Sequence, residues 1–152
     1  MQINYKRLLF DIFITFLIGN LFLFTIDTYF YDHLIKPFSV PSFVFPIVWS
    51  FLYLVMGISL YLIEESSSPD KKSAIFLYYF QLIVNSLWVP IFFYFKWFLF
   101  AFIWLIFLLF LVCILLYKFY FIRKITFYIN IPYLLWLLFA SYLNFYIYYF
   151  NG

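Results

Sequence analysis

Long apolar stretches, separated by short polar segments, make up most of the chain. A helix needs roughly 20 apolar residues, at about 1.5 Å per residue, to cross the hydrocarbon core of a bilayer. Five stretches reach this length: Leu8–Ile26, Val44–Ile63, Ala74–Phe93, Phe98–Tyr117 and Ile125–Phe150. A sixth, Asp27–Pro41, is short, polar and proline-bearing, so we interpret it as a loop. The pattern predicts an all-α integral membrane protein with five transmembrane helices, forming one domain over residues 1–152.

Composition supports residence in the membrane. Hydrophobic residues make up 69% of the chain and charged residues 10%, against roughly 45–50% and 25% in soluble domains. A soluble protein with so few charges could not cover its own surface. A transmembrane β-barrel would require strands in which apolar and polar residues alternate, whereas Phe98–Tyr117 is apolar throughout. Helices are therefore the expected way to satisfy the backbone hydrogen bonds in lipid.

The basic residues predict the orientation of the bundle. Five spans would place the N-terminus and the second and fourth loops on one side, with seven of the nine Lys and Arg residues. The other side would hold only Lys36 and Lys96. Under the positive-inside rule, the N-terminus is expected to be cytoplasmic in a bacterial plasma membrane. No small-residue cleavage pattern follows the first apolar run, so we expect a retained helix. The net charge of +3 is then a topology signal and does not indicate a nucleic-acid partner.

Amides and indoles inside the spans recur at helical spacing. Each of three predicted helices carries a mixed stripe on one face: Trp49, Tyr53 and Met56; Gln81, Asn85 and Trp88; Tyr133, Trp136, Ala140 and Asn144. Such groups can hold helices together by hydrogen bonds. They can also line a ligand cavity with indole walls, where the small Ala140 leaves volume. Periodicity alone leaves both interpretations open.

Three further expectations concern single features of the spans. Asp11 is the only charged residue within the five stretches; it lies within a turn or two of the cytoplasmic surface, and we expect it to point to water. Phe98–Tyr117 has no strongly polar group, so the fourth helix is expected to face lipid most. Pro132 removes a backbone hydrogen bond early in the fifth helix and is expected to kink it.

Three segments together resemble the TspO/MBR family, also called tryptophan-rich sensory protein, translocator protein or peripheral benzodiazepine receptor. Residues 31–60 read YDHLIKPFSVPSFVFPIVWSFLYLVMGISL, residues 81–93 read QLIVNSLWVPIFF, and residues 132–144 read PYLLWLLFASYLN. The motifs occur in order and with the family's spacing, and the resemblance extends from about Tyr31 to Phe150. This combination is highly specific.

The resemblance implies a five-helix bundle with a ligand pocket closed by the first loop, usually in a homodimer. The family binds porphyrins such as protoporphyrin and haem, sterols, and benzodiazepine-type compounds. By position, Tyr31 belongs to the lid loop, Trp49 and Trp136 face the ligand, and Asn85 and Ala140 lie beside them. The remaining motif positions of the expected ligand-binding set are Tyr53, Trp88 and Asn144.

The chain departs from the family pattern in places. Phe30 and Phe38 stand where many members carry Trp, so the lid keeps apolar bulk but loses two N–H donors. The last segment, LNFYIYYFNG, has no basic residue, so the sterol motif of animal members is absent. The fourth helix also lacks the acidic residue that members often carry.

Taken together, these features predict a membrane receptor or transport protein for planar apolar ligands. Porphyrins fit best, as ligand and not as a required cofactor. Their propionates need cations near the pocket mouth, for which Lys36 and Lys96 are candidates, and the loop residue His33 is a candidate haem ligand. One alternative is light-dependent porphyrin degradation, with Trp49 and Trp136 in redox roles. A second alternative is a regulatory membrane partner that binds no ligand. No span holds a paired carboxylate or a Cys–His set, which excludes hydrolytic and metal-centred chemistry.

Overall fold

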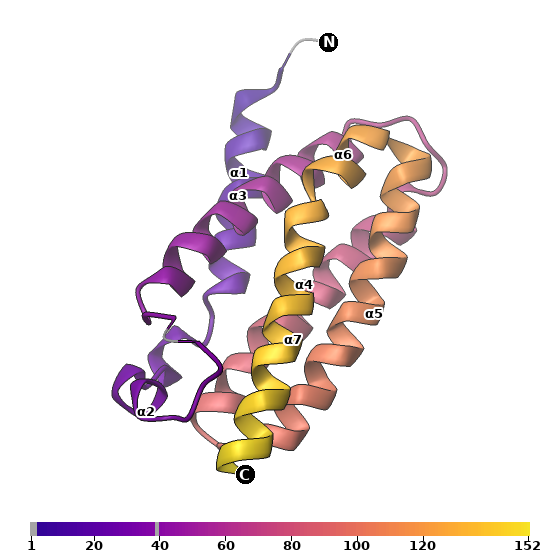
Figure 1. Cartoon of the computed structure of the whole chain (residues 1–152). Coiled ribbons are helices and arrows are strands. Elements are labelled where there is room, and N and C mark those ends of the chain that lie inside the picture. Colours follow the sequence, from indigo (N-terminus) through magenta and orange to yellow (C-terminus); the bar gives the residue numbers. More distant parts are fainter. Residues whose placement is uncertain (1–2, 39) are drawn as a thin grey trace.

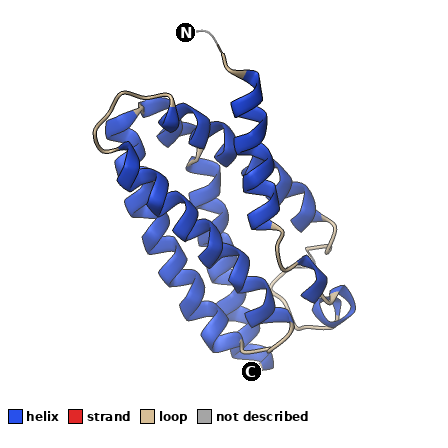
Figure 2. Cartoon of the chain, turned by 180° about the vertical axis from the view of Figure 1, so that it is seen from behind, coloured by secondary structure: helices blue, strands red, loops and turns tan. Residues whose placement is uncertain are grey.

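The computed structural model describes residues 3–38 and 40–152, and every regular element in this range is helical (Figure 2). The elements, in chain order, are α1 (Tyr5–Gly19), the 3₁₀ turn η1 (Leu23–Thr25), α2 (Thr28–Asp32), α3 (Val44–Glu64), α4 (Lys71–Phe93), α5 (Phe98–Ile122), α6 (Lys124–Ile129) and α7 (Ile131–Asn151). Five segments of this range are long and apolar enough to cross a membrane. The prediction of a five-helix membrane bundle is confirmed. The two termini lie at opposite ends of the bundle (Figure 1), as an odd number of spans requires.

The fifth span is interrupted at Asn130, where α6 ends and α7 begins. The Asn130 side chain donates to the carbonyl of Thr126 at 2.7 Å and to the hydroxyl of Ser59 at 2.6 Å, which fixes the break against α3. Pro132 lies in the first turn of α7, where a helix does not use the backbone N–H group. The expected kink within one helix at Pro132 is therefore wrong, because the proline helps to start a new helix.

The fourth span, α5, packs against α4, α6 and α7. One face of α5 is fully buried, with Ala101, Leu105, Leu108 and Val112 at most 2% exposed. The expectation that this helix faces lipid most is wrong: 39% of its apolar window is buried, against 17% for the window of α1. Lipid tails are as apolar as leucine, so the absence of polar groups does not tell which helix is peripheral.

The first span is held by close contact with α3 at two glycines. A Cβ atom on Gly57 of α3 would lie 2.6 Å from Cα of Ile12, and one on Gly19 of α1 would lie 2.4 Å from the ring of Tyr53. Small residues allow such approach between membrane helices. The Tyr53 hydroxyl donates to the carbonyl of Gly19 at 3.0 Å, which adds a polar tie at the same place.

The first loop is not wholly irregular, because it contains α2. Asp27 caps this short helix by accepting from the amide of Phe30 at 2.9 Å. Figure 1 shows α2 at the end of the bundle where the C-terminus lies, beside the start of α3. Residue 39 lies outside the described range, and the loop resumes at Val40. This placement sets α2 over the cavity described next.

Candidate ligand pocket

A cavity of about 330 Å³ lies beneath the first loop, in the half of the bundle that contains the C-terminus. Its wall combines the end of the first span, the loop with α2, the first half of α3, the second half of α4, Leu105 of α5, and α7 from Trp136 to Ile147. Ligand pockets of small molecules commonly measure roughly 300–1,000 Å³ and are mostly apolar with a few polar groups. The cavity has the size and the position expected of a pocket closed by a lid.

All eight residues that the sequence placed in the ligand-binding set line this one cavity. They are Tyr31, Trp49, Tyr53, Asn85, Trp88, Trp136, Ala140 and Asn144. The stripes converge because residues at helical spacing share a face, and the faces of α3, α4 and α7 turn inward at the same depth. Contact of these side chains with a ligand stays a prediction.

Aromatic rings form a connected wall along one side. Trp49 stacks on Tyr53 with ring centroids 5.4 Å apart, and Phe45 meets Trp136 edge-on at 5.8 Å. The ring of Tyr31 contacts Phe45 at 5.3 Å, which joins the lid to α3 and α7. Interlocked rings of this kind offer large flat apolar surfaces with restricted motion.

Three residues that line the cavity each carry a buried polar atom without a protein partner in the described part of the chain. The atoms are the hydroxyl of Tyr31, Nδ2 of Asn85 and Nε1 of Trp136. Each can donate a hydrogen bond, and a buried donor without an acceptor costs about 1–3 kcal/mol. A ligand that presents acceptors to these atoms would remove that cost.

Other polar groups of the same stripes serve to hold helices together. The indole of Trp88 donates to Oδ1 of Asn144 at 3.3 Å, which links α4 to α7. Deeper in the bundle, the hydroxyl of Tyr133 donates to Oε1 of Gln81 at 2.8 Å. The structure thus supports both interpretations of the stripes: Gln81, Trp88 and Asn144 connect helices, whereas Asn85 lines the cavity and its Nδ2 has no acceptor among the described residues.

The lid is held in place by hydrogen bonds to its backbone. Asn151, at the end of α7, accepts from the amide of Ile35 and donates to its carbonyl, both at 2.9 Å. The Lys36 ammonium donates to the carbonyl of Tyr31 at 2.7 Å and lies 4.1 Å from the centre of its ring. These contacts keep the Tyr31 side chain turned inward, with 5% of its surface exposed.

Two titratable groups of the lid are shifted by their surroundings. Burial raises the pKa of Tyr31 to about 12, so its hydroxyl remains a donor at neutral pH. Burial lowers the pKa of Lys36, and the carboxylate of Asp32 opposes that shift. The lid therefore presents a neutral phenol to the cavity and an ammonium group at its edge.

The other candidate charged groups lie at the lid and not inside the cavity. Lys96 places its ammonium 4.2 Å from the ring centre of Phe30. His33 is exposed, donates from Nδ1 to the carbonyl of Tyr29 at 2.8 Å, and is absent from the cavity wall. Phe38 is exposed as well. Within residues 3–38 and 40–152, no group of three or more His, Cys, Asp or Glu side chains is placed to hold a metal ion.

Some wall residues were not singled out from the sequence. Phe45 and Phe92 line the cavity, and periodicity could have identified them, since Phe45 precedes Trp49 by one turn and Phe92 follows Asn85 by two. Phe16 and Asn20 of the first span also line it. Their spacing of one helical turn, an aromatic ring followed by an amide, is the sequence signal that could have identified them.

Comparison with known proteins agrees with this arrangement. The TspO/MBR family model matches residues 12–150. Protein CrtK of Rhodobacter capsulatus is 39% identical over 66 residues, which cover 41% of each chain. The tryptophan-rich sensory protein of Cereibacter sphaeroides is 36% identical over 64 residues, 41% of this chain and 39% of that protein. The matched segment thus spans only about two fifths of these two relatives.

A third relative is matched over most of its length. The tryptophan-rich protein TspO of Chlorobaculum tepidum is 29% identical over 121 residues, which cover 78% of this chain and 77% of that protein. The family match covers nearly the whole bundle, including every wall residue of the cavity that the sequence predicted. The resemblance noted from the motifs is confirmed, and the chain belongs to the TspO/MBR family of integral membrane proteins.

Proposed function

We propose that this protein is a membrane receptor or carrier for a planar, largely apolar ligand that bears hydrogen-bond acceptors, and that this ligand is a porphyrin. The observation that carries the proposal is the coexistence, in one cavity, of an aromatic wall and three buried donors without protein partners. A flat macrocycle can stack on indole and phenol rings. Its ring nitrogens and carboxylates can accept from Tyr31, Asn85 and Trp136.

The charges at the lid support an anionic edge on the ligand. Lys36 and Lys96 both lie over lid aromatics, at Tyr31 and Phe30. A propionate that leaves the cavity beneath the lid would reach this side of the protein, where the predicted topology puts no other Lys or Arg. Benzodiazepine-type compounds with a carbonyl acceptor fit the same donors without needing the cations.

A second candidate function uses the same cavity. Trp49 and Trp136 both line it, so a bound porphyrin would lie against two indoles that can exchange electrons with an excited macrocycle. Light-dependent degradation is the activity that this arrangement favours among chemical ones. If no ligand binding is measured, a purely regulatory role without ligand is the alternative function.

The basic residues also support a proposed orientation. Lys6, Arg7 and Lys71 lie at the end of the bundle that holds the N-terminus, as do Lys118 and Lys124. By the positive-inside rule, this end would face the cytoplasm of a bacterial cell. The lid and the mouth of the cavity would then face outward.

The proposal is tested by titrating the purified protein with protoporphyrin in the dark and following tryptophan quenching. Trp136→Phe keeps an aromatic ring but removes the N–H donor, and we expect affinity to fall about tenfold, for a lost hydrogen bond of about 1.4 kcal/mol. Trp97→Phe is the matched control, because Trp97 is 56% exposed and lies outside the cavity wall. It should bind like the parent protein.

Illumination of the saturated complex then separates carrier from enzyme. Stable porphyrin absorbance under light supports binding alone, whereas new absorbing products that require Trp49 and Trp136 support degradation. Equal affinity in the parent protein and in Trp136→Phe would refute the role given to the indole donor. No saturable quenching at micromolar protoporphyrin would refute porphyrin as the ligand.

A further inference from the structure

Asp11 is buried in the first span, contrary to the expectation that it points to water. Its side chain is 2% exposed, and Oδ2 has no hydrogen-bond partner among the residues that the structure describes. The reason lies in its position on α1, where Asp11, Thr15 and Gly19 at i, i+4 and i+8 form the buried face. A carboxyl group on this face must enter the contact of α1 with α3 and α4.

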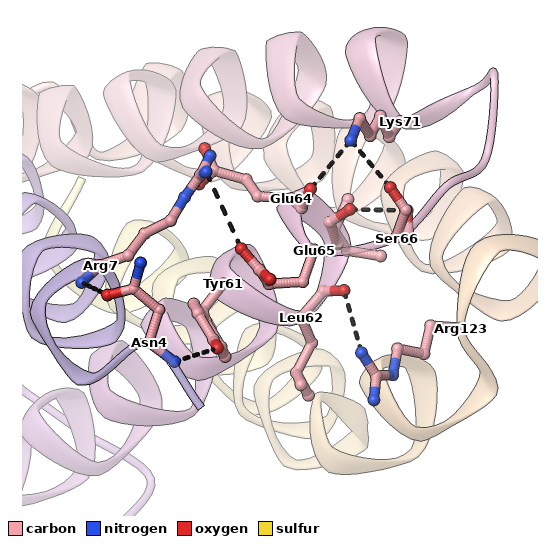
Figure 3. A network of polar contacts seen from close by, with 10 residues as sticks. Asn4, Arg7, Tyr61, Leu62, Glu64, Glu65, Ser66, Lys71 and Arg123 are labelled. Carbon is pink, nitrogen blue, oxygen red and sulfur yellow. Dashed lines mark hydrogen bonds and ion pairs between the residues drawn. The ribbon is translucent and has the colours of Figure 1, made fainter. Parts of the chain in front are cut away.

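The neighbouring cation is bound to another carboxylate. Arg7 lies one turn before Asp11, and its guanidinium contacts Oε2 of Glu64 through Nε at 2.8 Å and through Nη2 at 2.7 Å (Figure 3). Glu65 is further away, at 3.8 Å from Nη1. Arg7 thus has the carboxylates of α3 as its partners, and among the described residues no ion pair joins it to Asp11.

The other polar groups near this pair do not neutralise Asp11. On α1, the hydroxyl of Thr15 is bonded to the backbone carbonyl of Asp11 at 2.7 Å and to the hydroxyl of Tyr78 on α4 at 2.6 Å. Tyr79 of α4 also lies within electrostatic range. The remaining polar groups, Tyr61 and Lys71, lie on the Glu64 side of this contact.

Two of these groups are occupied elsewhere. The hydroxyl of Tyr61 on α3 accepts from the amide of Asn4 at 3.0 Å. Lys71 at the start of α4 donates to the carbonyls of Glu64 and Ser66, at 3.0 Å and 2.8 Å, and not to a carboxylate (Figure 3). A buried carboxylate without a partner is strongly disfavoured in a membrane span.

We propose that Asp11 carries one exchangeable proton, and that this proton keeps α1 docked on α3. In the docked state the carboxyl of Asp11 is protonated and neutral, while the carboxylate of Glu64 receives the two contacts from Arg7. Loss of the proton to water leaves an unpaired negative charge inside the contact and favours a displaced α1. The ligand of this site is the proton, and the site lies at the end of the bundle opposite the cavity.

A link to the cavity follows from the path of α1 and rests on the function proposed above. Ile12, next to Asp11, is in backbone contact with Gly57 of α3. About two turns further along the same helix, Phe16, Gly19 and Asn20 form part of the cavity wall. Loosening of α1 at Asp11 would therefore disturb that wall, and ligand affinity would fall as the pH rises. For one proton the change is at most about tenfold per pH unit.

Infrared difference spectroscopy of the ligand-free protein in lipid nanodiscs tests the proton site directly. The parent protein should show the carbonyl band of a protonated carboxylic acid, which is lost on raising the pH. Asp11→Asn, a neutral isostere of the protonated acid, should lack the band. The matched control Glu65→Gln, which changes the more distant carboxylate, should keep it. A band that survives in Asp11→Asn, or no such band in the parent protein, would overturn the proposal.

A second variant keeps the test decisive where Asp11→Asn does not fold. Glu64→Gln removes the neighbouring charge and frees Arg7 for Asp11, so the band should be lost at a lower pH than in the parent protein. An unchanged titration in Glu64→Gln would also overturn the proposal. Protoporphyrin affinity measured over the same pH range should become independent of pH in Asp11→Asn. A titrating band in a protein that does not bind protoporphyrin would refute the porphyrin proposal and leave the proton site standing.

Discussion

Substitution of Gly57 by alanine is the sharpest test of how α1 is held. The added Cβ would lie 2.6 Å from Cα of Ile12, 3.0 Å from its Cγ1 and 3.1 Å from its backbone nitrogen. Two of these three atoms belong to the backbone of α1, so no side-chain rotation can relieve the clash. Cβ atoms essentially never approach other atoms within 3.0 Å, and ordinary contact begins at 3.4 Å, so the distance from Ile12 must grow by at least 0.4 Å, and by 0.8 Å to reach ordinary contact.

The separation should be measurable in stability and in binding. Overpacking of a close contact typically costs about 1–3 kcal/mol, so the free energy of unfolding in detergent micelles, followed by tryptophan fluorescence, should fall by about that amount. Protoporphyrin affinity should fall as well, because α1 contributes Phe16, Gly19 and Asn20 to the cavity wall.

Leu54→Ala is the control on the same helix. Leu54 is 42% exposed, and removing surface bulk there should change the free energy of unfolding by no more than about 0.5 kcal/mol. A Gly57→Ala protein as stable as the parent would refute the close packing of α1 on α3. Unchanged ligand affinity in a destabilised Gly57→Ala protein would refute the contribution of α1 to the pocket.

Three further variants test separate parts of the site. Ala140→Phe should abolish saturable protoporphyrin quenching, because its ring would enter the cavity; normal binding would show that the pocket is misplaced. Asn151→Ala removes both 2.9 Å bonds to Ile35 and should speed ligand dissociation, measured by stopped flow, about tenfold, for about 1.4 kcal/mol lost. Asn151→Asp keeps the acceptor, so its dissociation rate should lie between those of the parent protein and Asn151→Ala. Equal rates in all three proteins would refute the role of Asn151 in holding the lid. Tyr133→Phe leaves the buried amide of Gln81 without its partner and should lower the free energy of unfolding by about 1–3 kcal/mol. Ligand affinity should be nearly unchanged. A large loss of affinity would contradict a purely structural role of this hydrogen bond.

The cavity residues on three helices could be predicted because their chemistry contrasts with the surrounding apolar sequence. An amide such as Asn85, or an indole such as Trp136, is rare enough inside a span that its helical phase indicates the inner face. Where every residue of a span is apolar, the sequence does not show which face of the helix points inward. The burial of Leu108 on α5, and the resulting central place of this helix, could not be read from a stretch in which every residue is apolar.

The features that the sequence misplaced have two other causes, which are a polar partner far away in the sequence and the phase of a helix. Asn130 breaks the fifth span because its side chain bonds to Ser59 of α3, a residue 71 positions away that the local pattern does not reveal. Asp11 was expected to reach water because it is close to the end of its helix. Its burial follows from the phase it shares with Thr15 and Gly19, the other buried residues of α1.

The donors without protein partners on residues of the cavity wall would allow a bound ligand to stabilise the closed lid. The donors without protein partners come from three separate elements: Tyr31 from α2, Asn85 from α4 and Trp136 from α7. A ligand that accepts from all three would connect the lid to two helices of the bundle, in addition to the bonds that Asn151 already makes with the lid backbone. Each bond from the ligand to Tyr31 exists only with the lid closed. Binding energy gained there must therefore favour the closed lid, and the occupied protein should exchange its ligand more slowly than the bonds of Asn151 alone would allow.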